Sequence, residues 1–107
     1  MATIEEFRLL QLKVGRILAA KTHPNADRLL VLTVDTGAGV QKEIVAGIAG
    51  HYTPEELVNK SVVVVDNMEP ATLRGVVSQG MVLAAQDGKK LSLVTPERLV
   101  AAGSTVK

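Results

Sequence analysis

The segment Asn67-Met68-Glu69-Pro70-Ala71-Thr72-Leu73-Arg74-Gly75-Val76-Val77-Ser78-Gln79-Gly80-Met81-Val82-Leu83-Ala84-Ala85 connects two apolar runs of the chain. It follows Val62–Val65, the most strand-like run in the sequence, and it ends in a second apolar run, Met81–Ala85. Two such strands are usually joined by a turn of a few residues. The longer connection predicts a binding loop carried by a β scaffold, and an ordinary long hairpin loop is the alternative.

The composition of this loop favours recognition chemistry. Arg74 offers a planar cationic fork, and Ser78 and Gln79 offer neutral hydrogen-bond donors and acceptors. Gly75 and Gly80 allow backbone conformations that other residues resist.

Length and composition indicate one globular domain over residues 1–107. Hydrophobic residues make up 47% of the chain and charged residues 21%, which is typical of a folded protein with one core. The absence of cysteine excludes disulfides, thiolate metal sites and a cysteine nucleophile. No apolar run approaches the roughly 20 residues that span a bilayer, and no signal peptide is apparent. We therefore expect a cytoplasmic protein without a membrane partner.

Hydrophobic patterning predicts a short helix, three strands, a second short helix and at least two further strands. Capping signals place the helices after Thr3 and after Thr53, where Pro54 occupies the first helical position. A helix between the third and fourth strands of a five-stranded Greek-key barrel is the OB-fold arrangement. We predict an all-β OB-fold, with a generic small β-barrel as the alternative. The expected strands are Leu12–Lys21, Leu29–Asp35, Gln41–Ala46, Ser61–Asp66 and Gly80–Ala85, with Leu91–Val94 returning after a turn at Asp87-Gly88.

The first expected strand contains a shift in its alternation. The shift falls at Gly15-Arg16, after which Ile17 and Ala19 resume the inward set. A bulge at a glycine has this effect and bends the strand, and a small closed barrel requires a long, bent first strand.

The charge balance limits how the chain could bind nucleic acid. A net charge of +1 requires that the cations be gathered on one face. The predicted bulge would place Lys13 and Arg16 together on the outer face, which is either a basic binding face or simply solvated surface. Only Phe7 and Tyr52 are aromatic, which disfavours single-strand binding by stacking but not recognition of a folded RNA by its shape.

Catalytic and metal-binding patterns are absent from the sequence. His23 and His51 stand in unrelated contexts, without a neighbouring nucleophile motif. The acidic pairs Glu5-Glu6 and Glu55-Glu56 occupy predicted first turns of helices, where capping already accounts for them. We expect no enzyme activity, no cofactor and no metal site.

Five motifs in this order resemble the tRNA-binding domain family, and the resemblance extends from about Phe7 to Lys107. That family includes the C-terminal domain or detached β-subunit of bacterial methionyl-tRNA synthetase, free-standing tRNA-binding proteins and a related export chaperone. The motifs are Val14-Gly15-Arg16-Ile17, His23-Pro24-Asn25-Ala26-Asp27-Arg28-Leu29, Ile44-Val45-Ala46-Gly47-Ile48, Tyr52-Thr53-Pro54-Glu55-Glu56-Leu57 and Leu73-Arg74-Gly75-Val76-Val77-Ser78-Gln79-Gly80-Met81.

The resemblance implies an OB-fold homodimer that binds the outer corner or other shape features of tRNA with little base specificity. It places Arg74, Ser78 and Met81 in the tract associated with RNA contact, and Lys42 just before the third-strand motif. The full set of candidate RNA-binding residues is Arg74, Ser78, Gln79, Met81, Lys42, Asn25, Arg28, Lys13 and Arg16. For Met81 the alternative is a core position, because flexible apolar side chains at strand starts are usually buried.

One departure separates this chain from many relatives, which carry a basic residue just after the loop proline. Here that position holds Ala71-Thr72, which predicts weak phosphate binding made useful by dimerisation or by a partner enzyme. The resemblance favours the non-catalytic C-terminal domain or β-subunit of methionyl-tRNA synthetase, which raises tRNA affinity and mediates dimerisation. Two alternatives are a peptide-binding chaperone that uses Met68, Leu73 and Met81, and a purely structural dimerisation module.

Overall fold

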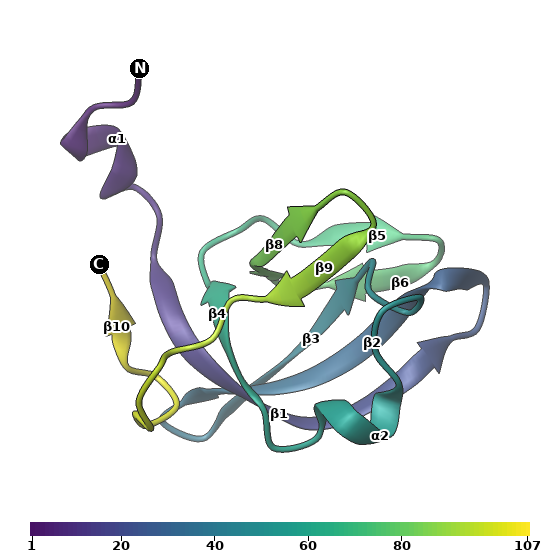
Figure 1. The fold of residues 1–107 in the computed structure, drawn as a ribbon. Coiled ribbons are helices and arrows are strands. Elements are labelled where there is room, and N and C mark those ends of the chain that lie inside the picture. The colour runs from purple at the N-terminus through teal and green to yellow at the C-terminus, as the bar shows by residue number, and fades with distance from the viewer.

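Antiparallel strands and two one-turn helices make up the structure, a computed structural model that describes all 107 residues (Figure 1). The predicted all-β class is confirmed, and so is the helix between the third and fourth strands. The elements are α1 (Ile4–Phe7), β1 (Leu12–His23), β2 (Ala26–Gly37), β3 (Val40–Ala46), α2 (Pro54–Leu57), β4 (Ser61–Val65), β5 (Ala71–Leu73), β6 (Val76–Ser78), β7 (Met81–Val82), β8 (Ala84–Asp87), β9 (Lys90–Leu93) and β10 (Thr105–Val106).

The main sheet has the strand order β3-β2-β1-β4-β7 and curls into a half-barrel, with β10 added beside the start of β1. The long strand β1 takes part in both halves of the sheet. Its Leu12–Arg16 portion pairs with β4, and its Arg16–His23 portion pairs with β2. The two ends of the order approach each other where the backbone N–H of Gln79 donates to the Glu43 carbonyl at 2.8 Å. This curled order matches the predicted OB arrangement.

The bend in β1 lies two residues later than the sequence predicted. Pairing with β4 is continuous from Leu12 to Arg16, and the register shift against β2 falls between Ile17 and Ala19. Ala20 therefore packs against the core, while Ala19 is exposed, which corrects the expected inward set. Gly15 has a different role from the one predicted: a Cβ there would lie 2.5 Å from Val34 Cγ1, so the glycine allows strands to cross closely.

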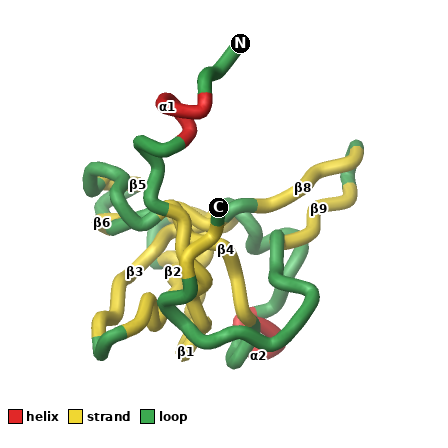
Figure 2. The backbone as a smooth tube through the Cα atoms, turned by 90° about the vertical axis from the view of Figure 1, so that its left-hand side faces the viewer, coloured by secondary structure: helices red, strands yellow, loops and turns green.

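The two helices have the predicted caps but different environments. In α2 the Thr53 hydroxyl accepts from the Glu56 N–H, Pro54 begins the helix and Leu57 is fully buried in the core. In α1 the Thr3 and Glu6 side chains form the same capping box, yet no residue of the helix is buried. Figures 1 and 2 show α1 standing away from the sheet as an N-terminal arm.

Two hairpins outside the main sheet follow β4 in the chain. Strands β5 and β6 pair with each other, and β8 and β9 form a second hairpin that projects from the body in Figure 2. The expected strand over 80–85 is thus divided: β7 continues the main sheet, and β8 leaves it after Leu83. The predicted turn at Asp87-Gly88 joins β8 to β9.

A single hydrophobic cluster fills the space enclosed by the curled sheet and α2. Its members come from β1 to β4, from the segment around α2 and from β9, so both halves of the sheet contribute to one core. No helix of the chain is long and apolar enough to cross a membrane. The cluster consists of Ile17, Leu30, Leu32, Val34, Ile44, Ala46, Ile48, Leu57, Val62, Val64 and Leu93.

Candidate nucleic-acid interface

The tip of the β5–β6 hairpin carries Arg74 and is fastened to the turn between β1 and β2. Leu73 pairs with Val76, so Arg74 and Gly75 form a two-residue turn with φ of 53° and 92°. Two successive positive φ values define a type I′ turn, which matches the twist of a hairpin. Arg74 Nη2 donates to the Asn25 carbonyl, and Asn25 Nδ2 donates to the Arg74 carbonyl, each at 3.4 Å. The fold thus brings together two predicted site residues that lie 49 positions apart.

The buried side chain of His23 holds this contact in place through two hydrogen bonds. Its Nδ1 accepts from the Asn25 N–H at 2.9 Å, and its Nε2 lies 2.9 Å from the Leu73 carbonyl. Because an N–H can only donate, Nδ1 is the unprotonated nitrogen, and the proton on Nε2 is donated to Leu73. The side chain is only 5% exposed, so His23 positions the hairpin and does not face a ligand.

Ser78 and Gln79 turn toward the edge of β3. The buried Ser78 hydroxyl accepts from the Val45 N–H at 2.9 Å and donates to the Gly80 carbonyl at 2.9 Å. Gln79 Oε1 accepts from the Glu43 N–H at 2.9 Å. Two side chains therefore take the place of a neighbouring strand along this edge, which would otherwise present unpaired N–H groups. Of these two residues, only the exposed Gln79 keeps donors, on Nε2, that no protein group takes.

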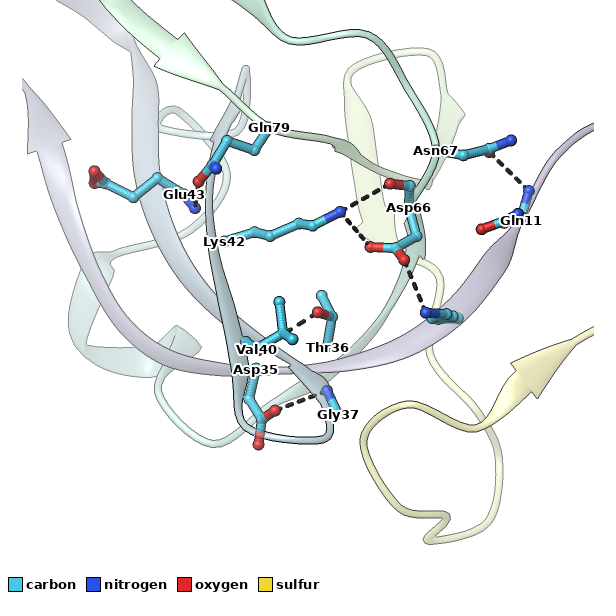
Figure 3. A network of polar contacts seen from close by, with 11 residues as sticks. Gln11, Asp35, Thr36, Gly37, Val40, Lys42, Glu43, Asp66, Asn67 and Gln79 are labelled. Carbon is cyan, nitrogen blue, oxygen red and sulfur yellow. Dashed lines mark hydrogen bonds and ion pairs between the residues drawn. The ribbon is translucent and has the colours of Figure 1, made fainter.

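Lys13 and Lys42 both pair with the carboxylate of Asp66, and Figure 3 shows Lys42 reaching it from β3. Lys42 Nζ lies 2.7 Å from Asp66 Oδ1 and donates to the Asp66 carbonyl at 2.9 Å, while Lys13 Nζ lies 2.9 Å from Asp66 Oδ2. Burial raises the pKa of Asp66, but hydrogen bonds and charges from Lys42 and Lys13 outweigh it, so the net shift of the pKa is downward. The cluster therefore holds two positive charges and one negative charge.

The expected outer basic face of β1 does not exist in the predicted form. No register shift separates Lys13 from Arg16, and residues three apart in a strand point to opposite faces. Lys13 lies opposite the core residue Val64, at the end of the curled sheet, whereas Arg16 lies opposite Asp35 on the outer face. The prediction that these two cations share a face is wrong, because the bulge comes after Arg16.

The remaining predicted residues lie apart from these clusters. Arg28 is exposed in β2, three positions from Asn25, and makes no ion pair. Met81 is 44% exposed, so it is not a core residue. It lines a largely apolar cavity of about 360 Å³ together with Met68 and Leu73. The three residues named above for the peptide-binding alternative therefore line one cavity.

The two aromatic residues are not arranged as stacking platforms. Phe7 lies on the N-terminal arm, and the Tyr52 hydroxyl accepts from the Leu93 N–H at 3.0 Å while its ring packs against the core. A surface that stacks successive bases is therefore not present. No group of three or more His, Asp or Glu side chains is placed to hold a metal ion.

Sequence reasoning missed three residues that organise these clusters: His23, Asp66 and Asn67. Asn67 Oδ1 accepts from the Gln11 N–H at 2.8 Å, and its Nδ2 donates to the Leu9 carbonyl at 2.7 Å, which holds the base of the arm. The polar pair Asp66-Asn67 directly after a buried strand was a usable signal, because polar groups there need partners. Nothing local predicted the contact of His23 with Leu73, 50 residues away.

Comparison with known proteins identifies the family. The profile of the family described as "Putative tRNA binding domain" matches residues 12–105, and the chain belongs to this family. The chain is 50% identical over 103 residues to the methionine–tRNA ligase of Pyrococcus horikoshii, and 46% identical over 104 residues to that of Thermotoga maritima. It covers 96% and 97% of its own length in these alignments, but only 14% and 16% of the two ligases.

Solved structures of similar size share the whole fold. The MetRS-related protein from Pyrococcus horikoshii superposes with a TM-score of 0.92 at 34% identity, covering 100% of this chain and 98% of that one. The chaperone CsaA from Bacillus anthracis superposes with a TM-score of 0.90 at 28% identity, covering 100% and 99%. Proteins named for both a synthetase and a chaperone therefore share this architecture.

Proposed function

We propose that this chain is a single, non-catalytic OB-fold domain that binds tRNA in the cytoplasm, as the tRNA-binding domain or β-subunit of a methionyl-tRNA synthetase. Membership of the family and the similarity to methionine–tRNA ligases support this proposal. The observation that carries it is the position of Arg74. A buried histidine, a type I′ turn and a reciprocal contact with Asn25 hold this cation at an exposed hairpin tip.

Arg74, Lys42 and Lys13 supply the phosphate contacts in this proposal. Such contacts orient an RNA without reading its sequence, which suits recognition by shape. The exposed Gln79 amide and Asn25 are placed to bond to backbone or 2′-hydroxyl groups, and Arg28 and Arg16 add positive charge at greater distance. Ser78 acts indirectly, because its hydroxyl is already occupied in positioning the loop. Met81 contributes an apolar contact at the margin of the same loop.

The test is a titration with tRNA at two salt concentrations, with a DNA duplex of equal charge as competitor. Arg74→Asn is the informative variant, because asparagine tolerates a positive φ and keeps the turn. We expect weaker binding and a salt slope lower by about one phosphate contact. Arg98→Gln, an exposed arginine of the C-terminal segment, is the matched control. Equal affinity and slope in Arg74→Asn and wild type would remove Arg74 from the interface.

We further propose that two copies associate through the N-terminal arm and so raise the affinity for tRNA. The arm exposes apolar side chains that a monomer would leave in water: Ile4 is 54% exposed, Leu9 72% and Leu10 47%. A dimer would bury them and would present two tRNA sites at once, which raises apparent affinity when both engage. Sedimentation of the full chain and of a variant lacking residues 1–10, which removes all three side chains, tests this. The same number of chains per particle in both proteins would contradict it.

Peptide binding is the second candidate function, and one observation favours it. Met68, Leu73 and Met81 line one apolar cavity, and methionines adapt to varied apolar ligands. The similarity to a protein named chaperone CsaA is consistent with this function. Peptide binding of this kind should be insensitive to salt and should suppress aggregation of an unfolded protein. The substitution Met81→Gln should weaken it. A purely structural dimerisation module would show neither this activity nor a preference for tRNA over the duplex.

A further inference from the structure

A hollow of about 380 Å³ lies at the end of the curled sheet, beside the turn that joins β2 to β3. Its charged lining residues are Lys13, Lys42 and Asp66. Its other walls are the turn and the segment before β10, which meet where the Gly37 and Gly103 Cα positions are so close that a side chain would not fit. The complete lining is Lys13, Thr36, Gly37, Ala38, Val40, Lys42, Asp66, Ala102 and Gly103.

The two ammonium groups retain donors that no protein group uses. Each lysine has three N–H donors. Lys42 makes two contacts, both to Asp66, and Lys13 makes one, so three N–H donors remain between them. The lysine side chains are 22% and 37% exposed, whereas that of Asp66 is 10% exposed. Solvent therefore reaches the cations more readily than the carboxylate.

The other acidic side chains nearby do not cancel the remaining charge. Asp35 Oδ1 accepts from the Gly37 N–H at 2.8 Å and lies opposite Arg16 on the outer face (Figure 3). Glu43 follows Lys42 in β3 and so points to the opposite face of the sheet. Asp66 is thus the single acid in the lining, and the hollow has a net charge of one positive unit.

We propose that Lys13 and Lys42, held side by side by Asp66, form a phosphate-binding site that opens into this hollow. Asp66 fixes the two ammonium groups around one point, so that an oxyanion can receive N–H donors from both at little cost in side-chain entropy. The carboxylate also offsets one of the two positive charges, so the electrostatic attraction for an anion is weaker than two unpaired lysines would give. The site is distinct from the hairpin tip at Arg74. As a contact for the tRNA backbone it rests on the proposed function; as a phosphate site it does not.

Inorganic phosphate is the probe for the site itself. Amide correlation spectra of ¹⁵N-labelled protein are recorded during a titration with phosphate at constant ionic strength, with chloride as the balancing anion. We expect saturable shifts at Gly37, Ala38 and Gly103, and loss of these shifts in Lys13→Gln. The matched control is Lys21→Gln, an exposed lysine farther along the same strand. Shifts that are absent from the wild type, or that persist in Lys13→Gln, overturn the proposal.

Asp66→Asn gives a second and opposite readout. Removal of one negative charge next to the two ammonium groups should tighten phosphate binding by about tenfold, since a charge a few ångströms away is only partly screened. An unchanged affinity in an Asp66→Asn protein with a native-like spectrum would contradict the site, because Asp66 is proposed both to position the two ammonium groups and to offset their charge. If this variant does not fold, the Lys13→Gln comparison still decides.

A tRNA titration separates the source of the phosphate from the existence of the site. With tRNA as the ligand, Lys13→Gln should lower the salt slope by about one contact. Phosphate shifts combined with an unchanged slope would support the site and assign it to a free phosphate ester. Binding of tRNA by a wild-type protein that shows no phosphate shifts would overturn the site and leave the proposed function standing.

Discussion

The Ser78 hydroxyl accepts a hydrogen bond from the Val45 N–H at 2.9 Å and links residues that lie 33 positions apart. The same hydroxyl donates to the Gly80 carbonyl, so both of its hydrogen-bonding functions are used inside the protein. Together with Gln79, it joins the loop after β4 to the edge of β3. The position of Arg74 and Met81 relative to the sheet depends on this junction.

Ser78→Ala should therefore destabilise the fold. The Val45 N–H would lose its acceptor in a buried position, and an unsatisfied buried donor costs about 1–3 kcal/mol. Urea unfolding measures the change. Ser92→Ala is the control, because the Ser92 hydroxyl is exposed and reaches only the Leu93 carbonyl, at 3.4 Å. A loss no larger in Ser78→Ala than in Ser92→Ala would contradict the assigned role.

His23→Ala should loosen the β5–β6 hairpin more than it unfolds the sheet. The substitution removes the hydrogen bond from His23 Nε2 to the Leu73 carbonyl, which joins the hairpin to the β1–β2 turn, and the bond from the Asn25 N–H to His23 Nδ1, which orders that turn. Only the two longer contacts between Asn25 and Arg74, each at 3.4 Å, remain. Amide hydrogen exchange should accelerate at Val76, whose strand depends on this anchor, and at Asn25. His51→Ala, at an exposed position, should leave both rates unchanged. Equal rates in His23→Ala and wild type would show that other contacts hold the hairpin.

Gly15→Ala should be among the most damaging single-methyl additions in this chain. The new Cβ would meet Val34 Cγ1 at 2.5 Å and Val64 Cγ2 at 2.8 Å, inside the core. Overpacking of this kind typically costs about 1–3 kcal/mol. The control is Gly50→Ala, where no atom lies within 4 Å. Thermal unfolding of the two variants provides the comparison, and a similar midpoint for both would refute the close crossing of the strands.

Acid should weaken the ion pairs by which Asp66 links the end of β4 to Lys13 in β1 and Lys42 in β3. Because the folded-state pKa of Asp66 lies below its ordinary value of 3.8, its ionised form stabilises the fold at pH values above 3.8. This contribution is lost as the pH falls through 3.8 and then through the lower folded-state pKa. The difference in unfolding free energy between wild type and Asp66→Asn should shrink over that range. For Glu97→Gln, which changes an exposed acid, the difference in unfolding free energy from wild type should not change with pH over that range. A difference for Asp66→Asn that is equally independent of pH would contradict the ion pairs.

The all-β class, both helices and the turn between β8 and β9 could be predicted because local chemistry determines them. Thr53 and Pro54 start a helix through groups within four residues, and the run Val62–Val65 suits a buried strand. The order of the family motifs along the chain also pointed to the Leu73–Met81 tract. The contacts of that tract could not be foreseen in the same way, because each partner comes from a distant part of the chain.

The sequence by itself determined the four long strands β1 to β4, where the helices begin and which loop carries Arg74, but not the short strands β5, β6 and β10 or the division of the expected strand over 80–85. Tertiary structure alone decided the directions of the side chains around that loop. Lys13 and Arg16 separate because the bulge falls after them, and a shift of one residue reverses every later side chain in a strand. His23, Ser78 and Asp66 acquire their roles only when the sheet curls and brings their partners within hydrogen-bonding distance, since such contacts depend on position in space and not on neighbours in sequence.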